Sequence, residues 1–123
     1  MKKVMVIDDA STVRMYHKAL LEELGIFVFE ASNGLEALEK AVEQPVDLFL
    51  VDINMPKMDG FTFVKEIRTR AQLCHIPAVM ISTEDQESDK QRGVEVGANL
   101  YLVKPVNPEE LQNTVTLLLG GLK

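Results

Sequence analysis

The sequence has one cysteine and no apolar run that approaches the roughly 18 residues of a membrane helix. Cys74 has no partner for an internal disulfide, so nothing favours a secreted protein. Only four apolar residues separate Lys3 from Asp8, which is too short a stretch for a signal peptide. These absences predict a soluble cytoplasmic protein that does not associate with membranes.

Basic residues are fewer than acidic residues, and glycine-rich phosphate loops are absent from the sequence. There are 13 Lys and Arg residues against 19 Asp and Glu residues, which gives a formal net charge of −6 at pH 7. This balance disfavours binding to nucleic acid or to an anionic membrane surface, because both are negatively charged. No glycine-rich loop of either nucleotide-binding type is present.

What the sequence does contain fits one globular domain. Its 123 residues are 46% apolar and 26% charged, without an internal repeat or low-complexity tract. We expect a single domain over residues 1–123, present as a monomer. Five apolar runs of strand length alternate with five stretches of helical period. Because the runs are apolar on both faces, they predict a doubly wound α/β fold with a parallel sheet between helices.

Start and stop signals bound the predicted helices. The first should run from about Ser11 to Leu24, with Gly25 as a left-handed cap, and Pro45 should stop the second. The last begins at Asn107-Pro108, a capping residue followed by proline at the first helical position. The apolar faces expected are Val13, Tyr16, Leu20 and Leu24 in the first helix, Leu35, Leu38 and Val42 in the second, Phe61, Val64 and Ile67 in the third, and Leu111, Val115 and Leu118 in the last.

Polar side chains follow four of the apolar runs. These side chains are Asp8 and Asp9, Asp52, Ser82, and Lys104. The carboxyl ends of parallel strands meet at one edge of a sheet, where open α/β sheets bind ligands. A lone aspartate at a strand end is usually a solvated cap, but that reading does not explain all five residues together. Three carboxylates, a hydroxyl and an ammonium suit a divalent cation and a phosphoryl group.

With Met55-Pro56-x-x-Asp59-Gly60 behind Asp52 and Pro105 behind Lys104, the sequence resembles the receiver domain of bacterial response regulators over essentially its whole length. The resemblance implies a flavodoxin-like (βα)5 fold, with a five-stranded parallel sheet in the order 2-1-3-4-5. It further implies a stand-alone, CheY-like signalling protein of the chemotaxis type. Such a protein is not an enzyme beyond catalysing its own phosphorylation and dephosphorylation.

The resemblance also implies roles for the carboxylates. Asp52 would receive a phosphoryl group from the phosphohistidine of a histidine kinase and become an aspartyl phosphate. Mg²⁺ would be the cofactor, because it relieves the repulsion among clustered carboxylates. Asp9 and Asp52 would supply carboxylate oxygens and Asn54 its backbone carbonyl, while Asp8 would hold a water of the ion.

Further residues would report or tune the phosphorylated state. By resemblance, Ser82 and Lys104 would contact the phosphoryl oxygens, and Tyr101 would be the aromatic switch that follows Ser82. The Lys104–Pro105 bond is often cis in the family. The positions flanking the attacking water in the family are Asn54 and Glu84, and Thr83 stands where a smaller residue is usual.

Several other residues have simpler interpretations. Asp59 is expected to cap the third helix, and Gly60 to serve close packing or an unusual backbone angle. His17 and His75 are expected to be ordinary residues at the surface or an edge, and Cys74 to lie in a loop without a role. Glu30, at the end of an edge strand, is expected to be structural.

The alternatives concern output and chemistry. The target is expected to be a protein such as the flagellar motor switch, although the almost wholly polar start of the fourth helix, residues 86–91, departs from motor-binding relatives. A phosphorelay shuttle, a phosphate sink or a regulator of another kinase would use the same chemistry. A magnesium-dependent phosphatase of the haloacid-dehalogenase type needs a second aspartate where Asn54 stands. An EF-hand is excluded by Pro56 and Lys57, which occupy the places of a ligand and the glycine.

Overall fold

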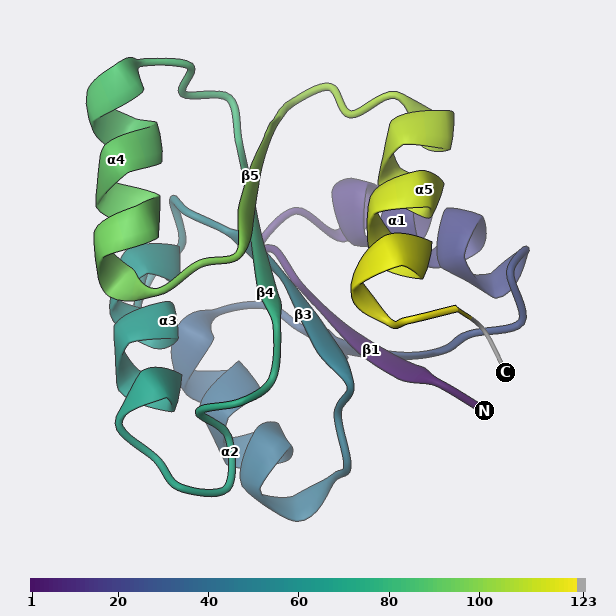
Figure 1. Cartoon of the computed structure of the whole chain (residues 1–123), viewed down its shortest axis with the longest axis horizontal. Helices are drawn as coiled ribbons and strands as arrows, with labels where there is room; N and C mark the ends of the chain where they lie inside the picture. Colours follow the sequence, from purple (N-terminus) through teal and green to yellow (C-terminus); the bar gives the residue numbers. More distant parts are fainter. Residues whose placement is uncertain (122–123) are drawn as a thin grey trace.

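The protein is described from a computed structural model, which defines residues 1–121 (Figure 1). Strands and helices alternate along the described chain. The strands are β1 (Lys3–Ile7), β2 (Phe27–Ala31), β3 (Leu48–Asp52), β4 (Ala78–Ser82) and β5 (Leu100–Val103). The helices are α1 (Ser11–Glu22), α2 (Gly34–Glu43), α3 (Gly60–Arg68), α4 (Glu87–Val96) and α5 (Pro108–Leu118).

The strands form one parallel sheet in the order β2-β1-β3-β4-β5, which confirms the predicted topology. The register of this sheet aligns the strand ends. Ile7 lies opposite Val51, and Ser82 lies opposite Val103. The residues that follow these pairs are therefore brought level at the carboxyl edge, which places polar groups from distant parts of the sequence side by side.

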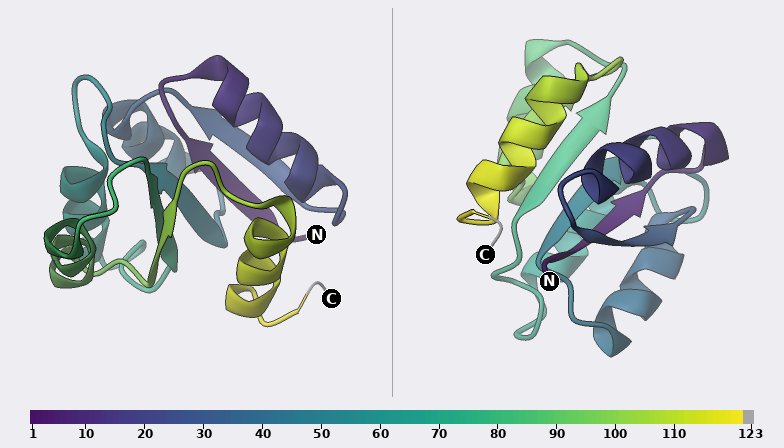
Figure 2. Two further views of the ribbon diagram at one scale, coloured as in Figure 1. Left: turned by 90° about the horizontal axis from the view of Figure 1, so that it is seen from above. Right: turned by 90° about the vertical axis from the view of Figure 1, so that its right-hand side faces the viewer.

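Helices cover both faces of the sheet (Figure 2). Alternate residues of the central strands enter two separate cores. Val4 and Val6 of β1 pack with residues of α1 and α5. Met5 and Ile7 pack with residues of α2 and α3 on the other face. Burial on both faces explains why these strands are continuous apolar runs.

The buried face of α1 differs from the prediction. Leu20 is buried as expected, but Tyr16 is 44% exposed, while His17 and Leu21 are only 3% and 0% exposed. The predicted surface position of His17 is therefore wrong. Because His17 is polar, it interrupts the apolar pattern of the helix. The sequence therefore did not show that the buried face includes His17 and Leu21 in place of Tyr16. The helix ends at Glu22 rather than Leu24, and Gly25 adopts the expected left-handed conformation with φ 77°.

The packing of α2 also departs from the prediction. Leu38 is buried, but Leu35 and Val42 are 43% and 49% exposed. The other buried residues of the helix are Gly34, Ala37 and Ala41. Small side chains let a helix approach its neighbours closely, and a Cβ on Gly34 would lie 2.8 Å from atoms of Met58. The face of α2 that carries small residues therefore packs inward, because it allows close approach, and the larger side chains of Leu35 and Val42 face solvent.

The remaining helix predictions are confirmed. Phe61, Val64 and Ile67 are buried in α3, and Leu111 and Val115 are buried in α5. Further buried residues of these helices are Phe63 and, at the cap of α5, Leu119. No helix within residues 1–121 combines the length and the apolar character needed to cross a membrane.

Local capping also follows the sequence. The Asp59 side chain accepts a hydrogen bond from the Thr62 N–H at 2.8 Å, and the Asn107 side chain accepts one from the Glu109 N–H at 2.9 Å. Gly60 serves close packing, because a Cβ there would overlap the backbone oxygen of Asp52. The start of α3 is thus pressed directly against the end of β3.

Candidate functional site

Three carboxylates converge at the carboxyl edge of the sheet. Asp8 and Asp9 follow β1, and Asp52 ends the neighbouring strand β3. One oxygen atom from each lies within 4.8 Å of the other two. Asp8 and Asp52 are 2% and 7% exposed, whereas Asp9 is open to solvent. The strand ends therefore bring these residues together as the sequence indicated.

Lys104, the residue directly after β5, reaches this cluster. Its Nζ donates a hydrogen bond to Asp8 Oδ2 at 2.7 Å and to Asp52 Oδ1 at 3.0 Å. The backbone N–H of Lys104 donates to the carbonyl of Ser82 at 2.7 Å, which fixes the start of the side chain. The Lys104–Pro105 peptide bond is cis, as is frequent in the family that the sequence resembles.

The electrostatics of the cluster favour an additional cation. Burial, reinforced by the charge of Asp8, raises the pKa of Asp52 to about 6 despite the opposing effect of Lys104. Burial lowers the pKa of Lys104, but its hydrogen bonds to Asp8 and Asp52 outweigh this and raise the pKa above its ordinary value. Three ionised carboxylates with one ammonium leave an excess of two negative charges.

The oxygen atoms present suit a magnesium ion. Asp8 is committed to the Ala10 N–H at 2.9 Å and to Lys104. Within residues 1–121, the Asp9 carboxylate, Asp52 Oδ2 and the Asn54 carbonyl accept no hydrogen bond. Hard oxygen donors, only some of them charged, match an ion that takes few protein ligands and keeps several waters.

Comparison with known proteins identifies the family. Residues 4–116 match the response regulator receiver domain. The chain belongs to this family. Receiver domains are signalling modules of two-component systems that generally use Mg²⁺, and the acidic cluster described above agrees with that general property.

Individual relatives agree with this assignment. The chain is 42% identical over 114 residues to the Sensor histidine kinase CheAY of Helicobacter pylori, covering 91% of this chain and 14% of CheAY. It is 36% identical over 121 residues to Protein PilH of Pseudomonas aeruginosa, covering 98% of this chain and all (100%) of PilH. The solved structure of chemotaxis protein CheY4 of Vibrio cholerae has a TM-score of 0.91 and 41% identity, covering 96% of this chain and 98% of that one.

A chain of hydrogen bonds leads from Ser82 of the receiver domain to Tyr101. Ser82 is 1% exposed, and its Oγ accepts a hydrogen bond from the Glu84 N–H at 3.1 Å. The Glu84 carbonyl accepts a hydrogen bond from the Tyr101 hydroxyl at 2.8 Å. The Tyr101 ring lies beside α4, where a Cβ on Gly93 would be 3.4 Å from it. Thr83 and Glu84 themselves are exposed.

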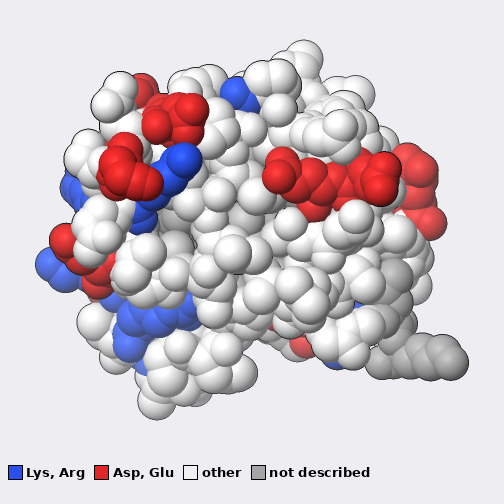
Figure 3. Space-filling model, turned by 45° about the horizontal axis from the view of Figure 1, so that its top comes forward, with Lys and Arg blue, Asp and Glu red and all other residues white. Residues whose placement is uncertain are grey.

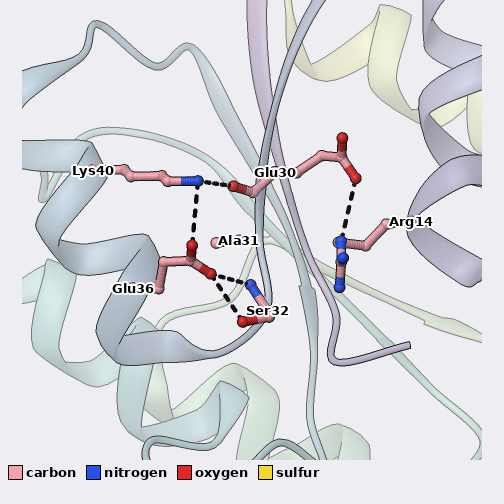
Figure 4. Close-up of a pocket in the computed structure, with 6 residues that line it drawn as sticks. All are labelled: Arg14, Glu30, Ala31, Ser32, Glu36 and Lys40. Carbon is pink, nitrogen blue, oxygen red and sulfur yellow. Dashed lines mark hydrogen bonds and ion pairs between the residues drawn. The ribbon is translucent and has the colours of Figure 1, made fainter. Parts of the chain in front are cut away.

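A polar cavity of about 240 Å³ lies beside the site, between α1, the end of β2 and α2 (Figure 4). Its charges are paired: Arg14 Nε contacts Glu30 at 3.2 Å, and Lys40 contacts Glu36 at 3.3 Å. Arg14 also donates from Nη1 to the Asp8 carbonyl at 2.7 Å, so it helps to hold the backbone of this member of the acidic cluster in place.

Sequence reasoning missed this role of Arg14. The available signal was the spacing of Arg14 and Lys18 on one helical face, and both side chains pair with Glu30. Glu30 therefore has the structural role expected of it. His75 is exposed, which agrees with its predicted surface position, and Cys74 is exposed in the segment before β4.

Proposed function

We propose that this receiver domain accepts a phosphoryl group on Asp52 from the phosphohistidine of a histidine kinase. The observation that carries the proposal is that the Asp52 carboxylate lies among Asp8, Asp9 and Lys104, and that one of its own oxygens accepts no hydrogen bond from residues 1–121. In the transfer, the P–N bond of the donor breaks while a P–O bond to Asp52 forms. The electron pair of the broken bond returns to the donor imidazole, which takes a proton from water.

Asp9, Asp52 and the Asn54 carbonyl would hold the magnesium ion, and Asp8 would hold one of its waters. Bound Mg²⁺ supplies positive charge that offsets the repulsion between carboxylates and the incoming phosphoryl group. Asp52 has a pKa of about 6, so it is mostly ionised at pH 7 and able to act as the nucleophile.

Lys104 and Ser82 would bind the phosphoryl oxygens after transfer. The Lys104 ammonium already lies 3.0 Å from Asp52, and a compact point charge suffices for this contact. The Ser82 Oγ accepts from the Glu84 N–H, which leaves its own proton available to donate. Movement of Ser82 toward the phosphoryl group would displace Glu84, whose carbonyl binds Tyr101. Phosphorylation is thereby communicated to β5 and α4.

The output surface would be the face formed by α4, β5 and α5. Val94, Leu100 and Leu117 are 67%, 41% and 74% exposed on these elements. Figure 3 shows mixed charges on the left, over α4 and α3, and an acidic band on the right, with uncharged surface between them. Such a surface suits a protein target. The similarity to chemotaxis protein CheY4 favours a target in a chemotaxis-type pathway, such as the flagellar motor switch or another signalling protein.

Asn54, Thr83 and Glu84 would set the lifetime of the aspartyl phosphate. All three are exposed, and they lie on the loops that follow β3 and β4 beside Asp52 and Ser82. In these positions they govern how water approaches the phosphorylated carboxylate. The β-branched side chain of Thr83 should slow that approach relative to a smaller residue.

The decisive experiment measures covalent phosphate. The protein is incubated with Mg²⁺ and acetyl phosphate, and intact mass spectrometry should show one added phosphoryl group. Asp52→Asn should abolish this addition, whereas Asp47→Asn, just before the other end of the same strand, should leave it unchanged. Full incorporation in Asp52→Asn would overturn the assignment of the nucleophile.

A further inference from the structure

A second cavity adjoins the phosphoacceptor site on the side of α1. It has a volume of about 330 Å³ and lies between α1, the loop after β4 and the loop after β5. The lining consists of Val13, Tyr16 and His17 from α1, Thr83 from the loop after β4, and residues 104–106. This volume falls at the lower end of the range for small-molecule sites.

His17 is the unusual residue of this cavity. It is 3% exposed, yet no hydrogen bond connects its ring to any other described residue. No fully enclosed side-chain nitrogen or oxygen atom in residues 1–121 lacks a partner. The ring nitrogens of His17 therefore reach accessible surface, and the surface that His17 lines is this cavity. A polar atom that borders a cavity and has no protein partner is free to hydrogen-bond to water or to another molecule.

The chemical character of the cavity is apolar and uncharged. Burial lowers the pKa of His17, so its imidazole is neutral near pH 7 and offers one donor and one acceptor. The ammonium of Lys104 is committed to Asp8 and Asp52, so this residue presents mainly its methylene stem. Val13, Pro105 and Val106 supply the remaining apolar contacts.

We propose that this cavity binds a small uncharged molecule with an apolar body and a single hydroxyl or amide group that hydrogen-bonds to His17. A charged ligand would have no free opposite charge to meet. Tyr16 stands at the cavity with its hydroxyl 3.4 Å from the Val106 carbonyl, a long and therefore weak hydrogen bond. The ring of Tyr16 is thus not firmly held against an entering molecule.

Binding here would be coupled to phosphorylation, and this part of the inference rests on the proposed function. Lys104 lines the cavity and also contacts Asp52, while Thr83 directly follows Ser82. Phosphoryl transfer would change the positions of both residues. A ligand that packs against them would therefore bind with different affinity before and after the transfer. Linkage then requires that phosphorylation change the affinity for the ligand by the same factor as the ligand changes phosphorylation.

The test uses 4-ethylphenol as the probe and benzoate as a charged comparison. In ¹H–¹⁵N correlation spectra of the unphosphorylated protein, 4-ethylphenol should cause saturable shifts at residues 16, 17, 83 and 106. Benzoate should cause none there. His17→Leu should weaken the binding at least about fivefold through the lost hydrogen bond, which corresponds to about 1 kcal/mol. His75→Leu, which removes the other and exposed histidine, should bind as the wild type does.

A second variant protects the test against poor folding of His17→Leu. Val13→Phe, at a half-buried residue of the lining, should fill the cavity and abolish the shifts while circular dichroism confirms the fold. Absence of saturable shifts in the wild type, or equal affinity in Val13→Phe, would overturn the proposal. The same amides responding only to a docked kinase domain would also overturn it in favour of a protein contact. Because the titration needs no phosphate and is repeated in Asp52→Asn, its failure is distinguishable from failure of the proposed function.

Discussion

Two half-buried cations lie at opposite edges of the same sheet, in contrasting surroundings. At the amino edge, Arg68 at the end of α3 donates to the carbonyls of Ile76 and Gly97 at 2.7 and 2.9 Å and to the Asn99 side-chain oxygen at 3.1 Å. All of these acceptors are neutral. At the carboxyl edge, the side-chain hydrogen bonds of Lys104 within the described part of the chain all go to carboxylates.

The contrast separates a structural charge from a functional one. The planar fork of Arg68 satisfies several oxygens at once and holds together α3, the loop before β4 and the end of α4. The compact ammonium of Lys104 neutralises only part of the charge around it. The excess negative charge at that edge therefore favours a cation, and the ammonium can exchange a carboxylate partner for an incoming phosphoryl group.

Replacing the structural cation should have the largest effect on stability. Arg68→Met removes the Arg68 donors from the Ile76 and Gly97 carbonyls and one of the two donors from the Asn99 side chain, so the free energy of unfolding should fall by about 2–4 kcal/mol. Urea denaturation measures this loss, and phosphorylation by acetyl phosphate below the transition should be unchanged. Arg70→Met removes only an exposed pair with Glu66 and should cost under about 0.5 kcal/mol. Equal losses in the two variants would remove the contrast.

Neutralising Asp52 should act in the opposite direction. The raised pKa, about 6 against 3.8, means that the folded protein binds more protons than the unfolded chain between these values. The contribution of Asp52 to stability therefore falls as pH rises through that window. In metal-free buffer, Asp52→Asn should be more stable than the wild type at pH 7.5, by at most roughly 3 kcal/mol.

Denaturation at pH 4 and pH 7.5 measures this effect as a difference between variant and wild type. The stabilisation should shrink toward pH 4, where the wild-type carboxyl is protonated as well. Asp47→Asn provides the matched control because its side chain is exposed. If Asp52→Asn were no more stable than the wild type at pH 7.5, the ionised Asp52 carboxylate would not lower the free energy of unfolding.

A smaller effect is expected from the exposed member of the acidic cluster. Asp9→Ala removes a carboxylate without a hydrogen-bond partner in the described chain, so stability without metal should barely change. The affinity for Mg²⁺ should fall about tenfold, which corresponds to about 1.4 kcal/mol. Isothermal titration measures the affinity, with Asp85→Ala as an exposed acidic control. Unchanged Mg²⁺ affinity in Asp9→Ala would show that Asp9 is not a ligand.

The smallest change tests the neutral acceptors around Arg68. The Asn99 side-chain oxygen accepts from Arg68 and from the Ala78 N–H at 2.9 Å. Asn99→Ala should cost about 1 kcal/mol of unfolding free energy. Asn99→Asp keeps both acceptor contacts and should recover most of that loss in the same urea measurement. If Asn99→Asp were as unstable as Asn99→Ala, these hydrogen bonds would not account for the contribution of Asn99 to stability.

The sequence predicted the parts of the site that depend on strand ends and local signals. Asp8, Asp9 and Asp52 converge because parallel strands deliver their next residues to one edge, and Asp59 and Asn107 cap the helices that they precede. These patterns are local, so a few neighbouring residues contain the information. The fold followed from the same apolar runs, together with the family resemblance that supplied the strand order.

Only the tertiary structure decided which groups are buried and what they meet. Nothing within one helix shows that His17 faces inward while Tyr16 and Leu35 do not. The acceptors of Arg68 come from separate loops, and the pairing of Lys104 with Asp8 joins residues 96 positions apart. The physical reason is that burial and pairing are set by how elements pack against one another, whereas local sequence determines mainly where each element begins and ends.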